Sequence, residues 1–375
     1  MRRTVRRAAV TAALAFLVIG LFWAQPQEKR FVPMANANLY QQRERTAPES
    51  IKQKLLSLRE MIRAEGLTFE VGYTKAMDLP LETLAGTKPI DNVQEIDRAQ
   101  RPVAVELVQA EADAEKEFLA KNPKMVVEFR RFVVPCAVDR AEFNWNSWGK
   151  VTPVRDQDGC GSCWDFGTVG AYEGSYAIRN NRLIDASEQY ILSCCKATIS
   201  NCGTCSGGWP QKAAQFLVSK GMATEAAVPY TATNAACPTS AATPYKAVAW
   251  SFVASGGGIP SVAAMKQALC TYGPLSVCVR VTAAFQAYKS GLFNEHDPGS
   301  INHCVTLIGW DEAQKAWLIK NSWGPTWGMN GYMWIAYDSN SIGMYALWVK
   351  AASRYFVLPL KYRDLLKKYD LIINR

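Results

Sequence analysis

One cysteine of this chain has surroundings typical of a reactive thiol. Cys163 ends the run Gln157-Asp158-Gly159-Cys160-Gly161-Ser162-Cys163, and Trp164 follows it. Because a thiol is mostly protonated near neutral pH, a nucleophilic cysteine needs a lowered pKa, which a neighbouring imidazolium and a helix N-terminus can supply together. The 375-residue chain has two histidines, His296 and His303. A fold that serves this thiol must therefore bring a histidine to it from 133 or 140 positions further along the chain.

His303 is followed by Asn321 in the run Lys320-Asn321-Ser322-Trp323-Gly324. A Cys-Gly-Ser-Cys-Trp run with His and Asn about 130–150 residues downstream is the signature of one protease family. Over residues 143–348 the chain resembles the papain-like, cathepsin-type cysteine proteases. The resemblance implies an α+β fold with a helical half carrying Cys163, a β-barrel-like half carrying His303 and Asn321, and the active site in the cleft between them. It rests also on Val151-Thr152-Pro153-Val154-Arg155, Ser187-Glu188-Gln189 and Cys205-Ser206-Gly207-Gly208.

The resemblance implies catalytic roles for four residues. Cys163 would open a helix whose N–H groups and dipole stabilise a thiolate. Gln157 would add a side-chain amide donor to the backbone donor for the oxyanion. His303 would hold the thiolate as an ion pair and then protonate the leaving amine. Asn321 would fix the tautomer of His303, and Trp323 would shield that hydrogen bond from water.

The same resemblance implies an extended substrate whose backbone pairs with Gly207-Gly208. The positions that match the pocket for the residue second from the cut are all apolar or soft, so a bulky apolar side chain is expected there. No histidine-rich loop that could bind a substrate carboxylate is visible, which favours an endopeptidase over a dipeptide-releasing enzyme. The pocket positions are Trp209, Pro210, Cys278, Cys304 and Leu347, and Trp323 is counted with the substrate-binding residues.

Two pairs of cysteines also have the spacing of a zinc site, Cys160-x-x-Cys163 and Cys202-x-x-Cys205. Further cysteines surround both pairs, and Cys163 leads directly into an expected helix. Eleven cysteines in an exported chain are better explained by disulfides plus a free thiol. We therefore expect no metal and no cofactor.

The resemblance also implies disulfide pairings. Cys160 matches the family partner of Cys205, and Cys194 matches the partner of Cys237. Cys195 and Cys202 would then be left close together, where they could form an extra bridge. The partners of Cys136, Cys270, Cys278 and Cys304 stay open, and a bond between Cys278 and Cys304 would make the substrate pocket more rigid.

Residues 1–27 have the layout of an export signal, with a basic start before the uncharged residues 8–27. Because roughly 20 uncharged residues also suffice to span a bilayer, a signal anchor is the alternative. The protein is expected in a secreted, periplasmic or other exported compartment, or anchored in a membrane if the segment is retained.

The net charge of +9 comes from the two ends of the chain. Residues 1–24 carry four arginines and no acid, and residues 350–375 carry seven basic and two acidic residues. The body between them is neutral overall, which argues against a surface that follows a phosphate backbone. No nucleic-acid partner is expected; the expected partners are peptide or protein substrates.

Residues 28–138 precede every motif that the resemblance uses. Ile51, Leu55, Leu58 and Ile62 recur at helical spacing before Gly66, which predicts an amphipathic helix of roughly four turns. A second helix is predicted over about residues 103–120. An exported protease must stay inactive until it has folded, so we interpret this region as a propeptide that inhibits the catalytic domain, residues 139–350, within the same chain. A separate small domain is the alternative.

Residues 351–375 form an extension beyond the catalytic domain. Leucines, tyrosines and basic residues alternate over residues 358–373, which predicts a basic amphipathic helix. A packed terminal extension is the simpler interpretation, and contact with a membrane surface or a partner is the alternative.

Asp165 departs from the family pattern, which usually has a small apolar residue two positions after the nucleophile. A carboxylate there would tend to raise the pKa of the thiol. The sequence therefore supports two hypotheses, an exported cysteine endopeptidase made as a zymogen and a weak or inactive homologue that serves as a binding module. Retention of Gln157, Cys163, His303 and Asn321 together favours the enzyme.

Overall fold

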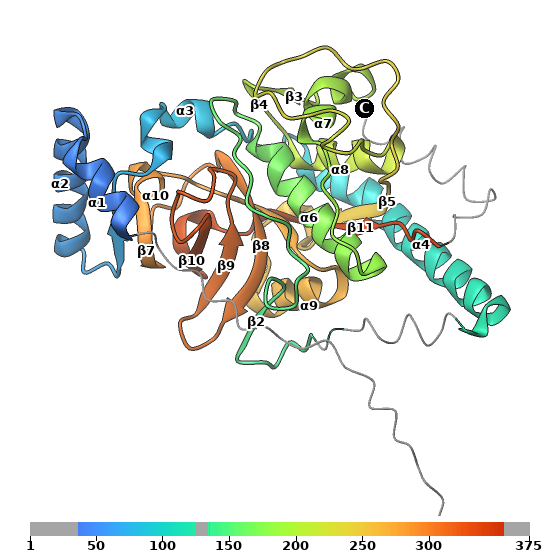
Figure 1. Ribbon diagram of the computed structural model, residues 1–375. Coiled ribbons are helices and arrows are strands. Elements are labelled where there is room, and N and C mark those ends of the chain that lie inside the picture. Colours follow the sequence, from blue (N-terminus) through green and yellow to red (C-terminus); the bar gives the residue numbers. More distant parts are fainter. Residues whose placement is uncertain (1–36, 125–133, 135, 356–375) are drawn as a thin grey trace, which may run out of the picture.

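The fold is built from a buried helix packed on one mixed sheet. The computed structural model describes residues 37–124, 134 and 136–355. Helix α6 (Cys163–Asn180) packs against strands β8 (His303–Asp311), β6 (Leu275–Val279) and β11 (Met344–Ala351), and against helix α8 (Pro210–Ser219) (Figure 1). The α+β class expected from the sequence is confirmed.

The sheet runs in the order β1-β7-β10-β9-β8-β6-β11-β5, and β2 pairs with β8 outside this path. Neighbouring strands are antiparallel except for β7 and β10, which are parallel. The remaining bounds are β1 (Phe69–Val71), β2 (Glu142–Asn144), β5 (Ala247–Phe252), β7 (Tyr288–Phe293), β9 (Ala316–Lys320) and β10 (Tyr332–Ala336). Short strands β3 (Gly203–Thr204) and β4 (Gly207–Gly208) form a separate pair.

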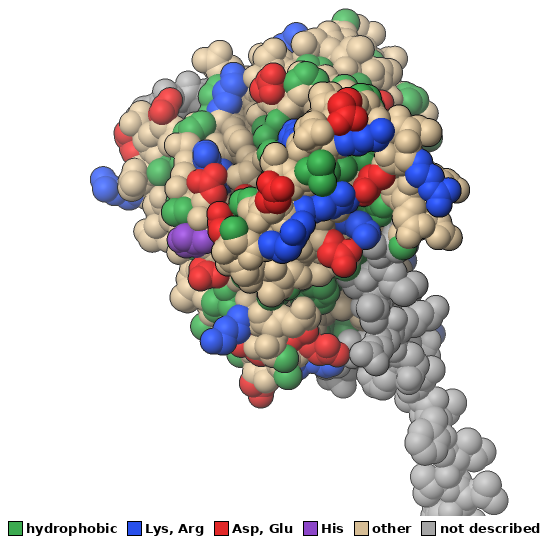
Figure 2. All heavy atoms as spheres, turned by 90° about the vertical axis from the view of Figure 1, so that its left-hand side faces the viewer, with side chains coloured by type: hydrophobic (Ala, Val, Ile, Leu, Met, Phe, Trp, Pro, Cys, Tyr) green, Lys and Arg blue, Asp and Glu red, His purple; other side chains and the backbone are tan. Residues whose placement is uncertain are grey.

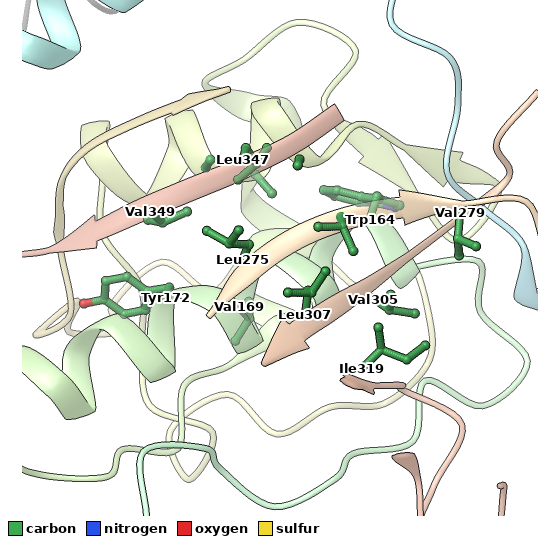
Figure 3. Packing of buried hydrophobic residues seen from close by; sticks show 14 of the residues in the cluster. Trp164, Val169, Tyr172, Leu275, Val279, Val305, Leu307, Ile319, Leu347 and Val349 are labelled. Carbon is green, nitrogen blue, oxygen red and sulfur yellow. The ribbon is translucent and has the colours of Figure 1, made fainter. Parts of the chain in front are cut away.

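Helix α6 is buried over residues 163–177 and at Asn180, as expected of a helix that is apolar on more than one face. Trp164, Val169 and Tyr172 pack with Leu307 of β8 and with side chains of β6 and β11 in the main core (Figure 3). The sequence prediction of a helix that opens at Cys163 is confirmed, and His303 begins strand β8.

Three glycines allow α6 to approach the sheet closely. A Cβ atom at Gly170 would lie 2.3 Å from Thr306 Oγ1, and one at Gly174 would lie 2.4 Å from Cγ of Pro274. A Cβ at Gly167 would lie 3.2 Å from Cβ of Cys304. Gly167 lies near the start of α6, and Cys304 lies near the start of β8. The close approach of these two residues therefore helps to set the distance between the two ends.

The helices before residue 139 match the sequence prediction in part. The helix predicted from Ile51 to Ile62 is confirmed as α2 (Glu49–Ala64), after α1 (Ala37–Arg45). The second is confirmed as α4 (Val93–Lys121), but it begins ten residues before the predicted start and continues through Pro102. A proline lacks the N–H that a helix interior needs, so the sequence pattern suggested a start after it. Packing against β5 outweighs this preference.

Shorter elements complete the fold. The 3-10 helix η1 (Lys75–Asp78) and helix α3 (Leu81–Leu84) link β1 to α4. The other helices are α7 (Glu188–Cys194), α9 (Val262–Tyr272) and α10 (Ala283–Gln286), and the other 3-10 turns are η2 (Cys195–Ala197), η3 (Ser255–Gly257) and η4 (Ser339–Ser341). In Figure 1, α1 and α2 lie at one end of the molecule and α4 lies at the opposite end.

Disulfides join Cys160 to Cys205 and Cys194 to Cys237, the pairings that the resemblance implied. Cys195 bonds Cys202, and Cys136 bonds Cys270 of α9, a pairing that sequence left open. Cys163, Cys278 and Cys304 are free and buried. With Cys160, Cys202 and Cys205 in disulfides, the four cysteines of the alternative zinc site are not available together.

The predicted signal segment, residues 1–27, and the predicted helix over residues 358–373 lie outside the described residues. Among the helices that are described, none is both long and apolar enough to span a membrane. Acidic and basic side chains are interspersed over the face that carries α1 and α2 (Figure 2).

Close packing of α6 predicts that Gly174→Ala lowers the stability of the protein. Alanine normally stabilises a helix interior by about 0.5–1 kcal/mol relative to glycine. The added methyl group would overlap the Pro274 ring, however, and overpacking a core typically costs about 1–3 kcal/mol. The melting temperature should therefore fall. Gly258→Ala is the control, since a Cβ there meets nothing within 4 Å, and an unchanged or raised melting temperature for Gly174→Ala would contradict the packing argument.

Candidate active site

Cys163 is the first residue of α6 and has no solvent exposure. Its sulfur accepts a hydrogen bond from the Gly86 N–H at 3.3 Å and lies 3.2 Å from the Thr87 hydroxyl oxygen. The first N–H groups of a helix have no partner within it, and they stabilise negative charge at this end. Local structure thus favours a thiolate at this position.

His303 begins β8 and is fully buried. Its Nε2 lies 2.8 Å from Oδ1 of Asn321, the residue that follows β9. Its Nδ1 has no other partner among the described residues, which leaves this nitrogen for the sulfur of Cys163. The indole of Trp323 lies beside the imidazole, with ring centroids 4.7 Å apart. Asn321 therefore holds one side of the ring while an aromatic wall excludes water from that contact.

The environment of Cys163 lowers the pKa of its thiol to about 7, from an ordinary value of 9.0. Burial has the largest single effect and acts to raise this pKa. The charge of His303 and its hydrogen bond to the sulfur act in the opposite direction, with help from Thr87 and the Cys304 backbone, and together they outweigh burial. The arrangement can therefore hold a substantial fraction of thiolate at neutral pH.

Gln157 lies next to these residues in a fully buried position. Its Oε1 accepts from the Ser322 hydroxyl at 2.7 Å, and its Nε2 donates to the Cys160 carbonyl at 2.8 Å and to the Leu84 carbonyl at 2.9 Å. The side-chain amide is thus oriented by its neighbours and offers an N–H to an oxygen brought in from another segment. Gln157, Cys163, His303 and Asn321 are called the thiol cluster below.

Residues 84–89, the covering segment, lie across the thiol cluster. The Gly86 carbonyl accepts from the Gly208 N–H at 2.9 Å, and the Lys88 N–H donates to the Gly208 carbonyl at 3.0 Å. These bonds make a parallel bridge between Thr87 and Gly208 of β4. A Cβ at Gly86 would lie 1.8 Å from the Gly161 carbonyl oxygen, so only glycine fits here. Sequence reasoning missed Gly86 and Thr87, because no local pattern marks a segment whose fit depends on a distant surface.

The predicted substrate-binding residues fall in two groups. Gly207 and Gly208 form β4, and Trp209 and Pro210 follow at the start of α8. The Trp209 indole donates to the Pro89 carbonyl at 2.9 Å, so it already contacts the covering segment. Trp323 lies beside His303, as described above.

Cys278 and Cys304 lie opposite each other on β6 and β8 and are fully buried. Burial, reinforced by the neighbouring Cys304, raises the pKa of the Cys278 thiol well above its ordinary value. These two cysteines form a small apolar cluster with Ile301, against which Met344 and Tyr345 pack. Leu347 packs in the main core (Figure 3), and its place in the substrate pocket stays a prediction.

Asp165 is fully buried, and neither of its carboxyl oxygens has a hydrogen-bond partner among the described residues. Burial, followed by the charge of Glu188, raises the pKa of Asp165 well above its ordinary value. The raised pKa favours the uncharged carboxyl, and an uncharged carboxyl does not oppose a thiolate at Cys163. His296 is exposed and lies in the loop between β7 and β8, with Nδ1 at 3.2 Å from the Asp338 carbonyl.

Within the described part of the chain, no group of three or more His, Cys, Asp or Glu side chains is arranged to hold a metal ion. The chemistry that the thiol cluster can perform is that of an activated thiol with an acid–base partner and an amide donor.

His303→Gln removes the imidazole whose charge and hydrogen bond lower the pKa of Cys163. Because burial still raises this pKa, we expect it to increase from about 7 to above 9 in the variant. The measurement is a pH titration of thiolate absorbance in the intact protein, with the Cys163→Ala spectrum subtracted. His296→Gln, at the exposed second histidine, is the control and should leave the titration unchanged. A midpoint that stays near 7 in His303→Gln would contradict this account.

Comparison with known proteins agrees with this geometry. A family model described as papain family cysteine protease matches residues 140–351. Pro-cathepsin H of Mus musculus is 35% identical over 214 residues, which cover 55% of this chain and 63% of that protein. Cathepsin L2 of Homo sapiens is 37% identical over 213 residues, which cover 53% of this chain and 61% of that protein. The chain thus spans somewhat less than two thirds of these two relatives.

Solved structures give the same result. The bromelain protease from Ananas comosus, solved with the E64 inhibitor, matches with a TM-score of 0.51 at 32% identity and covers 56% of this chain and 98% of that one. Digestive procathepsin L 3 from Tenebrio molitor larval midgut matches in fold with a TM-score of 0.57 at 24% identity, covering 79% and 88%. The two-subdomain papain-like fold expected from the sequence is confirmed. Because the family model matches more than half of the chain and includes the whole thiol cluster, this chain belongs to the papain family of cysteine proteases.

Proposed function

We propose that the protein is an exported cysteine endopeptidase made as a zymogen. The observation that carries the proposal is that one peptide segment contacts both the Gln157 amide and the Cys163 sulfur. The Leu84 carbonyl accepts from the Gln157 amide, while the next residues bring Gly86 and Thr87 to the Cys163 sulfur. A peptide backbone can therefore lie with a carbonyl at the amide donor and the chain beside the thiol, as hydrolysis of a peptide requires.

In the proposed reaction the Cys163 sulfur attacks the scissile carbonyl carbon, and a C–S bond forms. Gln157 and the backbone N–H at the start of α6 stabilise the charge on the carbonyl oxygen, an effect typically worth ~10²–10³ in turnover per donor. His303 protonates the leaving amine as the C–N bond breaks, which leaves a thioester. Water then attacks the thioester with His303 as base, which releases the acid and restores the thiol. Asn321 keeps the imidazole oriented through both steps.

The covering segment supports the zymogen part of the proposal. It directs the Gly86 N–H, rather than a carbonyl carbon, at the Cys163 sulfur. A sulfur that accepts a hydrogen bond from an amide has no electrophile to attack, so the segment can fill the site without being cut there. Residues 37–78 anchor it further: β1 pairs with β7, and the Tyr40 hydroxyl donates to the Gly328 carbonyl at 3.0 Å.

The pocket chemistry supports a preference for a bulky apolar residue second from the cut. Trp209, Pro210 and the Cys278–Ile301–Cys304 cluster offer no charged partner to such a side chain. Export is supported by four disulfides, which persist in oxidising compartments. The binding-module alternative gains little support from Asp165, because the raised pKa of this residue favours its uncharged form.

Incubation of the purified precursor at acidic pH should convert it to a shorter form that hydrolyses peptides with an apolar residue second from the cut. The hydrogen bond from Lys289 lowers the pKa of Glu70 in β1, so the stabilisation from this anchoring pair is lost as the pH falls through that lowered pKa. Gel analysis and a fluorogenic peptide assay measure both changes. Cys163→Ala should stay whole and inactive; peptide hydrolysis by this variant, or none by the wild type, would contradict the proposal.

Gly86→Ala should make the uncut precursor active. The added Cβ would overlap the Gly161 carbonyl and must displace the covering segment, a cost of about 1–3 kcal/mol. Since each 1.4 kcal/mol is tenfold in an equilibrium, occupancy of the open state should rise roughly 10- to 100-fold. The initial rate of peptide hydrolysis at neutral pH, before any trimming, measures this. Gly258→Ala should keep the latency of the wild type, and equal latency in Gly86→Ala would count against the inhibitory role.

A further inference from the structure

Helix α4 differs from the rest of the propeptide-like region in what it contacts. The covering segment and residues 37–78 contact the thiol cluster, β4, β7 and α10. Helix α4 instead packs on β5 and η3, at the far end of the molecule from α1 and α2 (Figure 1). It also lies outside the residues that match the papain family model.

Helix α4 presents one continuous buried stripe to the sheet. Its members recur every three or four residues over five turns and are at most 8% exposed, whereas Val105 on the opposite side is 62% exposed. Val93, Ala104 and Leu107 belong to the same hydrophobic core as the catalytic strands. The stripe consists of Val93, Asp97, Gln100, Ala104, Leu107, Ala110 and Glu111.

Strand β5 depends on this helix for cover. It is the last strand in the sheet order, yet all six of its residues are buried. Both α4 and α8 pack against β5. Proteins usually protect an edge strand by covering it, and a bare apolar edge strand is prone to associate with other chains. Removal of α4 would uncover backbone along this edge, including the Trp250 carbonyl that accepts from the Gln100 amide.

The polar members of the stripe are matched to partners in the catalytic half. Oδ2 of Asp97 accepts from the Gly256 N–H at 3.0 Å, and the Gln100 amide donates to the Trp250 carbonyl. Glu111, 2% exposed at its side chain, pairs with Arg179 of α6 at 3.1 Å and with Lys350 of β11 at 3.0 Å. A buried charge that loses its partner is strongly destabilising. These contacts are those of a core element rather than of a removable cover.

The chain segments before and after α4 determine which proteolytic cuts can release this helix from the catalytic domain. At the end of the covering segment Lys88 and Pro89 are exposed, and between it and α4 Asp91 and Asn92 are exposed. Downstream, Cys136 is bonded to Cys270 of α9. A cut at the boundary expected from the sequence, after residue 138, would leave the upstream chain joined to the catalytic domain through this disulfide. A cut within residues 88–92 frees the covering segment and leaves α4 in place.

We propose that α4 is a permanent part of the mature catalytic domain, and that activation removes only the chain before about residue 92. This inference rests on the proposed zymogen function. It divides residues 28–138 into an inhibitory part, which leaves, and a structural helix, which stays and closes the edge of the sheet.

The first test does not depend on peptidase activity. In the full-length Cys163→Ala protein, cleavage sites for a sequence-specific protease are placed at residues 89–92 and at residues 122–124. After both cuts, acidic size-exclusion chromatography should separate the N-terminal fragment from the catalytic domain while the α4 fragment elutes with the domain. Elution of the α4 fragment away from the domain, under conditions that keep the domain soluble, would overturn the proposal.

The second test uses the activated enzyme. Leu107→Ala should lower the melting temperature of both the precursor and the activated enzyme, and the matched change Val105→Ala should lower neither, because one side chain is fully buried and the other is exposed. The intact mass of the activated enzyme should place its first residue near 92. An activated enzyme that begins after residue 121, and whose melting temperature is insensitive to Leu107→Ala, would contradict the proposal. If no activated enzyme forms, the proposed function fails and the first test still decides the role of α4.

Discussion

The contact between the start of α6 and the start of β8 is the interaction on which the rest of the structure depends. It places the sulfur of Cys163 against the imidazole of His303 in a site from which water is excluded. Burial alone would keep the thiol protonated, so the imidazole and the hydrogen-bond donors around the sulfur must together supply more stabilisation than burial removes. The glycines of α6 make this contact close, and Asn321 and Trp323 hold the ring that completes it.

The three free thiols show how strongly this contact changes one residue. Cys163 and Cys278 are both fully buried. Cys304 of β8 is adjacent to both: it pairs with Cys278 of β6, and its backbone hydrogen-bonds the Cys163 sulfur. The pKa of Cys163 is lowered, whereas that of Cys278 is raised well above its ordinary value. Burial is common to both, so the difference comes from the imidazole and the hydrogen-bond donors that face only Cys163. Reactivity is therefore a property of the contact rather than of the cysteine.

Much of the site could be predicted from the sequence, because the papain-like motifs have a fixed order and each marks one residue of the thiol cluster. The helix at residues 51–62 follows from local periodicity. Features that depend on distant surfaces could not be predicted in this way: the Cys136–Cys270 bond, the fit of Gly86 against Gly161, and the start of α4 before Pro102. The charge state of Asp165 was also beyond the sequence, since burial and Glu188 determine it.

The region before the catalytic domain combines two physical roles in one chain. In the proposed zymogen, its first part inhibits by presenting an amide N–H to the sulfur, which is a weak and reversible contact that depends on its anchors. Its last part, α4, contributes buried side chains to the main core and covers an edge strand. A stretch of chain with exposed residues lies between the inhibitory part and α4. Latency and stability of the catalytic domain are thereby assigned to different segments.

The central claim, that the contact with His303 makes Cys163 alone reactive, is tested most directly by locating where a thiol-alkylating peptidyl epoxide binds. Mass spectrometry of the acid-treated protein reports the labelled cysteine among the three free ones. The account predicts one label, on Cys163, at neutral pH. Labelling of Cys278 or Cys304 at a comparable rate, or the absence of any label on Cys163, would contradict it.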